Sequence, residues 1–223
     1  MRFPVLLTGA LLLSTGSLAA QQPMGGMKDP DHSVAGGGQF PAGWHVRTER
    51  NAALANVKFV AMGDGFHATM GPAAIMWRDA DTASGDYHTV ATFTQTKAPM
   101  HPEAYGLIIG GKNLDGDAQS YTYLIVRGTG EFSIWRRAGY ANKPTAVVPW
   151  TANAAVHKAD ADGKATNELA VLIKNGKASF TVNGTEVYSA DASTVDAAGI
   201  VGYRVNHNLD VHLSAIGIHR ISN

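Results

Sequence analysis

The chain has 223 residues, among them 25 glycines and no cysteine, and its 18 basic residues balance its 18 acidic ones. The absence of cysteine excludes disulfides, thiolate zinc sites and thiol nucleophiles. The lack of a basic surplus argues against nucleic acid as a partner. An apolar fraction of 45% is enough for a sizeable core, and the many glycines indicate tight turns rather than long helices.

The first 20 residues have the pattern of a secretory signal peptide. Arg2 precedes an apolar run over residues 3–13, and small residues follow at positions 17, 19 and 20. This run is shorter than the ~20 residues that a membrane-spanning helix needs. We therefore expect an exported protein with no membrane span after signal removal. A cysteine-free exported chain fits a bacterial periplasm or the extracellular space, because eukaryotic secreted domains tend to carry disulfides.

The segment 21–43 is rich in glycine and proline, including Gly36-Gly37-Gly38. Such a segment can bury little apolar surface, which predicts a flexible leader. The folded domain is expected to cover residues 44–223.

From residue 44 onward the dominant pattern is period-two alternation interrupted by glycine turns. It predicts strands at residues 56–61, 66–70, 74–78, 87–95, 105–110, 121–127, 132–137, 168–174, 177–182, 185–188, 199–206 and 210–221, the last with a bulge near Ser214-Ala215. Asn175-Gly176 and Asn183-Gly184 predict two tight hairpins in succession. Residues 151–166 fit a loop or one helical turn. Many strands without a fixed repeat predict an all-β, two-sheet antiparallel jelly-roll sandwich.

Segments 167–173, 177–184 and 199–204, followed by Val211-x-Leu213 and Ile216-x-Ile218, resemble the concanavalin-A-like lectin/glucanase superfamily. Residues 105–111 and 121–139 fit the same pattern. Within the superfamily the chain is most similar to laminin-G-like domains and to the bacterial 3-keto-disaccharide hydrolase-type family. The resemblance implies a jelly roll with one concave sheet on which a carbohydrate or a protein partner sits.

Catalysis is not indicated by any short motif. Laminarinase-type relatives carry Glu-x-Asp-x-Glu on one strand, and no such segment occurs here. We therefore expect a carbohydrate-binding module, and the neutral net charge is compatible with uncharged glycans. One alternative is a hydrolase of the 3-keto-disaccharide type with His207, Asp210 or Glu103 as acid–base groups. The other is a laminin-G-like adhesion or assembly module with a protein partner.

Aromatic residues beside arginines indicate where a sugar would bind, because rings stack on sugar C–H faces and guanidinium groups donate fixed hydrogen bonds. The predicted ligand-binding residues are Trp77, Arg78, Trp135, Arg137, Arg204, Asn206 and His207. For Trp77, filling the sandwich interior is the favoured alternative.

Strand alternation assigns faces to these candidates. Phe132, Ile134, Val201 and Tyr203 should point into the core, which leaves Trp135, Arg137, Arg204 and Asn206 on the opposite face. Gly202 would keep that face shallow enough for a ligand to approach.

Two pairs of aspartates are candidate calcium ligands, since loop carboxylates are hard oxygen donors. They are Asp79 with Asp81 and Asp115 with Asp117. The alternative is that these aspartates only form turns. Asp210 and His212 share one strand face and could bind a metal or act as acid and base, but with no third ligand nearby they are better explained as polar residues on a wet face.

Overall fold

The computed structural model describes residues 29–222, so the predicted signal peptide lies outside the described residues. These residues form fifteen strands and three short 3₁₀ turns. The strands are β1 (His45–Thr48), β2 (Val57–Met62), β3 (Gly65–Met70), β4 (Ala74–Ala83), β5 (Tyr87–Gln95), β6 (Ala104–Lys112), β7 (Ser120–Arg127), β8 (Glu131–Ala138), β9 (Thr145–Ala152), β10 (Ala165–Lys174), β11 (Lys177–Val182), β12 (Thr185–Asp191), β13 (Gly199–Val205), β14 (Asp210–Leu213) and β15 (Gly217–Arg220). The turns are η1 (Glu49–Asn51), η2 (Leu54–Asn56) and η3 (Ala192–Thr194). No helix among residues 29–222 has the length and apolar character needed to cross a membrane.

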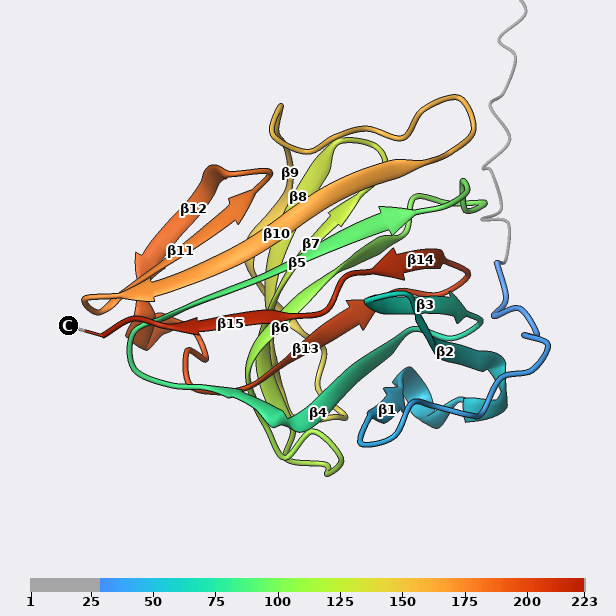
Figure 1. Cartoon of the computed structure of the whole chain (residues 1–223), viewed down its shortest axis with the longest axis horizontal. Coiled ribbons are helices and arrows are strands. Elements are labelled where there is room, and N and C mark those ends of the chain that lie inside the picture. Colours follow the sequence, from blue (N-terminus) through green and yellow to red (C-terminus); the bar gives the residue numbers. More distant parts are fainter. Residues whose placement is uncertain (1–28, 223) are drawn as a thin grey trace, which may run out of the picture.

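The strands form two antiparallel sheets that pack face to face (Figure 1). One sheet has seven strands in the order β1-β4-β13-β6-β7-β8-β9. The other has the order β12-β11-β10-β5-β14-β3-β2, and β15 pairs with β5 beside β14. This architecture confirms the predicted all-β, two-sheet antiparallel sandwich.

The two predicted Asn-Gly hairpins are present. Asn175 and Gly176 have φ values of 51° and 74° between β10 and β11, and Asn183 and Gly184 have values of 49° and 77° between β11 and β12. Two consecutive positive φ values are what a two-residue hairpin of this type requires, and Asn-Gly is the pair that adopts them at least cost.

Strands β1 and β9 were not expected from the sequence. They are the two edge strands of the seven-stranded sheet. β1 has only four residues, and β9 carries Pro149 and has no buried residue. Proline is tolerated at a sheet edge. A strand of four residues is too short to show alternation, and a strand without buried residues has no apolar face, so neither strand carries the period-two signal of apolar and polar residues. The predicted bulge near Ser214-Ala215 is confirmed as the interruption that separates β14 from β15.

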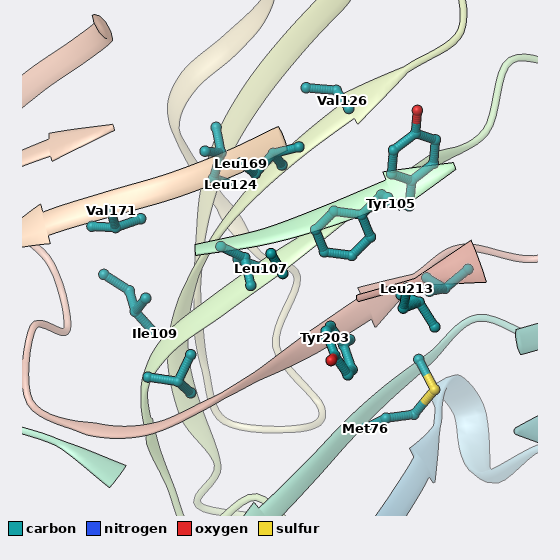
Figure 2. Packing of buried hydrophobic residues seen from close by; sticks show 14 of the residues in the cluster. Met76, Tyr105, Leu107, Ile109, Leu124, Val126, Leu169, Val171, Tyr203 and Leu213 are labelled. Carbon is teal, nitrogen blue, oxygen red and sulfur yellow. The ribbon is translucent and has the colours of Figure 1, made fainter. Parts of the chain in front are cut away.

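The main core lies between the sheets (Figure 2). Leu107 and Leu124 of the seven-stranded sheet face Leu169 and Val171 of the other sheet. Tyr203 is fully buried there and stacks on Trp44, with ring centroids 5.4 Å apart.

A second apolar cluster lies on the outer face of the seven-stranded sheet. On β6, Leu107 and Ile109 belong to the main core, whereas Ile108 belongs to the second cluster, as period-two alternation requires. The cluster contains Ile75, Trp77, Ala104, Ile108, Leu114, Tyr121, Tyr123 and Ile125, with Trp135, Trp150 and Ile200 packed against it. The outer face of this sheet therefore carries aromatic side chains of the kind that ligand-binding sites use.

Residues 29–43, within the predicted leader, lie against the domain. The Asn208 side chain donates hydrogen bonds to Asp29 Oδ1 and to the carbonyl of Pro30, and it accepts one from the backbone N–H of His32. Phe40 packs on the main core. This segment therefore contributes side chains to the surface near the β13–β14 connection.

Candidate functional site

The centre of the site is a carboxylate shared by two buried arginines. Glu49 Oε1 accepts a hydrogen bond of 2.7 Å from Nη2 of Arg204 and one of 3.0 Å from Nη2 of Arg137. The side chains of Arg204 and Arg137 are only 7% and 8% exposed, and that of Glu49 is 36% exposed. The guanidinium of Arg204 also lies 5.0 Å from the ring centroid of Tyr123, which is a favourable cation–π contact.

The strands place the two arginines and a strained turn places the carboxylate. Arg137 and Arg204 occupy positions on β8 and β13 that alternate with the core residues Ile134 and Tyr203 in the predicted way. Glu49 begins η1, whose next two residues, Arg50 and Asn51, have φ values of 56° and 51°. Left-handed backbone at two consecutive residues other than glycine is uncommon, and such conformations cluster at functional sites.

Arg47 and Tyr140 brace this turn. The Arg47 guanidinium lies 4.0 Å from the ring centroid of Tyr140 and donates to the carbonyls of Leu114 and Gly116. The Tyr140 hydroxyl donates to the carbonyl of Thr48 and accepts from the backbone N–H of Asn51. These contacts hold the turn over the outer face of the sheet.

Charges fix the protonation of the central groups. The positive charge of Arg204 lowers the pKa of Glu49 below its ordinary value, against the opposing effect of burial. Burial acts to lower the pKa of Arg204, but the Glu49 carboxylate together with Tyr121 and Tyr123 outweighs burial and raises the pKa of the guanidinium. Burial raises the pKa of Tyr123 to about 12. At neutral pH the centre therefore holds two cations, one anion and a neutral phenol.

Two adjoining cavities meet at Glu49, Arg50 and Arg204, and we call them together the Arg204 groove. The larger has a volume of about 340 Å³ and is lined by Arg47, Thr48, Glu49, Arg50, Ile75, Gln119, Tyr121, Arg137, Tyr140, Ala141, Asn142, Lys143, Pro144 and Arg204. The smaller has a volume of about 180 Å³ and is lined by Asp31, Glu49, Arg50, Pro72, Ala73, Glu103, Arg204, Asn206 and His207. The larger volume lies at the lower end of the range of about 300–1,000 Å³ typical of small-molecule sites.

The smaller cavity holds an imidazole between two carboxylates. His207 Nε2 lies 2.8 Å from Glu103 Oε1, and His207 Nδ1 lies 3.2 Å from Asp31 Oδ1. Asn206 Nδ2 donates to the second oxygen of Glu103 at 3.1 Å. A histidine paired in this way can hold or relay a proton.

Four of the seven predicted ligand-binding residues thus line the groove, namely Arg137, Arg204, Asn206 and His207. Trp135 lies on the same sheet face but packs against the second apolar cluster and lines neither cavity.

Trp77 and Gly202 differ from the expectation. Trp77 does not fill the interior of the sandwich: it is 4% exposed in the outer cluster and stacks on His45 at 5.3 Å. Gly202 is buried, and a Cβ there would lie 2.5 Å from the carbonyl oxygen of Met76 and 3.1 Å from Cβ of Trp77. Close packing between β13 and β4, rather than access for a ligand, explains this glycine.

Arg78 lies away from the groove. Its guanidinium makes two hydrogen bonds of 2.8 and 2.9 Å to Asp81 and lies 5.1 Å from the ring of Trp44, a core residue. Consecutive residues of a strand point to opposite faces, so Trp77 and Arg78 do not share a surface. A register irregularity follows in β4, where residues 78–81 bulge out of the pairing with β13.

The four candidate calcium ligands either form ion pairs with basic side chains or lie apart from one another. Both oxygens of Asp81 accept from Arg78, Asp79 faces His45 at 3.4 Å, and Asp117 is 98% exposed beside Arg47. Asp115 lines a surface depression next to Trp77. In residues 29–222 no group of three or more histidine and carboxylate side chains has the arrangement of a metal site.

Asp210 and His212 share a face, as predicted, on the second sheet and apart from the groove. Asp210 contacts His67 and Lys97, and the rings of His67 and His212 meet edge to face at 4.8 Å. Burial acts to raise the pKa of Asp210, but hydrogen bonding from Thr96 and the nearby positive charges outweigh it and lower the pKa.

Sequence reasoning missed Glu49, Arg50, Tyr121 and Tyr140 as site residues. A signal for the first two was available, because Arg47-Thr-Glu49-Arg50 is a dense charged segment in a chain with only 16% charged residues. Nothing in the sequence places this segment opposite β8 and β13, which lie 88 and 155 residues away.

No protein-family profile matches the chain, and no curated protein sequence is similar to it. Solved structures do match. The carbohydrate-binding module CBM66 from Bacillus subtilis aligns with a TM-score of 0.56 and 13% identity, over 79% of this chain and 95% of that one. The Bacillus licheniformis β-glucanase aligns at 0.52 with 10% identity, over 83% and 95%. Alginate lyase A1-II′ aligns at 0.51 with 12% identity, over 80% and 94%.

These similarities show that the chain has the concanavalin-A-like jelly-roll fold. The fold that the predicted resemblance implied is thereby confirmed. The closer resemblance to the 3-keto-disaccharide hydrolase-type family stays a prediction.

Proposed function

We propose that this protein binds carbohydrate in the Arg204 groove on the outer face of the seven-stranded sheet. The observation that carries the proposal is the larger cavity, where the half-buried ring of Tyr140 lies beside the guanidinium groups of Arg137 and Arg204. Aromatic faces and fixed hydrogen-bond donors are the two features that sugar recognition needs. Among the structures that share the fold, one is named a carbohydrate-binding module and another a β-glucanase, which supports the proposal.

Export is part of the proposal. The signal-like pattern of residues 1–20 and the lack of cysteine support a periplasmic or extracellular location. There the groove would meet polysaccharides or oligosaccharides from outside the cell.

The test is a glycan-array screen of the protein, followed by calorimetry on each sugar that binds. Two variants probe the groove: Asn206→Ala and Arg50→Ala change side chains that line it. Lys174→Ala, an exposed position on β10 in the other sheet, is the matched control. We expect both groove variants to weaken binding and the control to leave it unchanged. Equal binding by all four proteins would refute the proposed site.

Glycosidic-bond cleavage is a second candidate, and the pairing of His207 with Glu103 at 2.8 Å favours it. Glu49 and Glu103 both line the smaller cavity, so two carboxyl groups are available to a substrate there. The release of reducing ends from each bound glycan would be measured for the wild type and Glu103→Gln. Turnover that the substitution abolishes would establish cleavage, and absence of turnover on every bound glycan would leave binding as the function.

A further inference from the structure

We infer that the larger cavity of the Arg204 groove receives the carboxylate of an acidic sugar, that is, a uronic-acid residue of a glycan. This inference rests on the proposed function and specifies the ligand class of the same site. It departs from the expectation of an uncharged ligand that the neutral composition suggested.

The lining of the larger cavity is strongly cationic. Arg47, Arg50, Arg137, Lys143 and Arg204 line it, and Glu49 is the one carboxylate among its lining residues. The larger cavity therefore carries a local excess of positive charge, although the net charge of the chain is zero. A local positive field in a recess attracts anionic ligands even where the net charge is zero.

Two of these arginines already donate hydrogen bonds to backbone carbonyls of the protein. Arg47 donates to the carbonyls of Leu114 and Gly116, and Arg137 donates to those of Tyr140 and Asn142. Their roles are structural at least in part. Arg50 and Lys143 are exposed at the rim, where they add positive charge.

Arg204 is different, because most of its donors are unused. Its side chain is 7% exposed and Nη2 donates to Glu49, whereas Nε and Nη1 are buried and have no hydrogen-bond partner among residues 29–222. Nε of Arg137 is in the same state. Buried charged groups with unpaired donors are costly. Glu49 supplies one carboxylate to two guanidinium groups, so the pair retains an excess positive charge.

A second carboxylate would satisfy this centre. The planar guanidinium binds carboxylates through paired hydrogen bonds, and such charge-assisted bonds are among the strong ones. The half-buried Tyr140 lines the same cavity and can pack against the sugar ring that carries the carboxylate. A uronic acid combines both features in one residue.

The residues that line the smaller cavity determine the orientation of the bound ligand. Asp31 and Glu103 line it in addition to Glu49, and they would repel a second carboxylate at close range. We therefore expect the acidic residue in the larger cavity and the hydroxyl groups of a neighbouring residue near Glu103, Asn206 and His207.

The test uses calorimetry with uronic-acid oligosaccharides, namely oligomers of glucuronate, galacturonate and mannuronate. Each is compared with the same oligosaccharide after chemical reduction of its carboxyl groups, which removes the charge and keeps the sugar chain. We expect reduction to weaken binding by about tenfold or more, and raising the salt concentration to weaken only the binding of the acidic form. A sulfated neutral oligosaccharide is the third arm, because a sulfate could also satisfy Arg204.

Two variants test the assignment to Arg204. Arg204→Lys keeps the charge but removes the planar pair of donors, and Arg50→Ala removes an exposed cation at the rim. We expect both to lose more affinity for the acidic oligosaccharide than for its reduced form, because only the acidic form carries the charge that these cations recognise. Lys174→Ala, on the other sheet, should behave as the wild type. The melting temperature of each variant is recorded, so that a folding defect in Arg204→Lys is recognised and the comparison then depends on Arg50→Ala.

The outcomes separate this inference from the proposed function. Equal affinity for the acidic and reduced forms overturns the inference and leaves carbohydrate binding intact. Binding of the sulfated arm alone overturns the choice of a carboxylate. Absence of binding in all three arms and on the glycan array overturns the proposed function as well.

Discussion

Oε1 of Glu49 lies 2.7 Å from Nη2 of Arg204, although 155 residues separate them in the chain. This contact joins the strained turn after β1 to the middle of the seven-stranded sheet. It also places a negative charge beside the buried guanidinium of Arg204. The contact is therefore both structural and electrostatic, and its two contributions can be measured separately.

Replacing Glu49 by glutamine should destabilise the protein by about 1–3 kcal/mol. The substitution keeps the shape of the side chain but leaves Arg204 and Arg137 without their carboxylate. The partial exposure of Glu49 keeps the loss below that of a fully buried pair. Urea denaturation at pH 7 measures the difference. Asp79→Asn is the control, since its carboxylate is 76% exposed and its loss should cost less than about 0.5 kcal/mol. A loss as small for Glu49→Gln would contradict the role assigned to the carboxylate.

The contribution of Glu49 should depend on pH in a defined direction. Arg204 lowers the pKa of this carboxyl from its ordinary value of 4.5 in the folded protein. The stabilisation is therefore fully present above pH 4.5, and it is lost as the pH falls through the lowered folded value. The difference in unfolding free energy between wild type and Glu49→Gln should hold from pH 7 to pH 5 and shrink below that. A difference that stays constant down to pH 3 would show that the charge is not what stabilises the contact.

Most of the fold could be predicted from the sequence because most strands face the core on one side. β5 and β11 were predicted with their observed bounds, since both alternate regularly. Phe132 and Ile134 face inward as predicted, which placed Arg137 on the outer face. The edge strands β1 and β9 escaped prediction, because a strand that packs on one neighbour and buries little carries no periodic signal.

The site was predictable only in part for the same reason. Arg137 and Arg204 were found through alternation, which is a local property of β8 and β13. Glu49 was missed, because its role depends on the packing of the turn after β1 against two distant strands. For Trp77 the favoured alternative, the interior of the sandwich, was wrong, because nothing in its sequence neighbourhood shows that the outer face of the sheet is itself apolar.

Gly176→Ala should test the hairpin that the Asn-Gly pair forms. Gly176 has a φ of 74°, and a Cβ there would meet no atom within 4 Å. The expected loss of about 1–2 kcal/mol therefore arises from the left-handed backbone alone. Gly116→Ala is the matched control, because that glycine lies outside the left-handed region and its Cβ would make only an ordinary contact of 3.6 Å. Thermal denaturation of both variants checks the prediction, and equal losses would rule out backbone strain as the cause.

Calcium should leave the stability of the protein unchanged. The candidate ligand Asp81 already has both oxygens bonded to Arg78, and Asp117 is almost fully exposed. A cation bound by Asp81 would have to displace Arg78, and the lost ion pair would offset the gain from binding. We expect the melting temperature to move by less than about 1 °C when millimolar calcium or a chelator is added, since a ligand stabilises a protein only when its concentration approaches or exceeds its dissociation constant for the native state. A rise of several degrees that Asp79→Asn or Asp115→Asn abolishes would instead establish a calcium site at these loops.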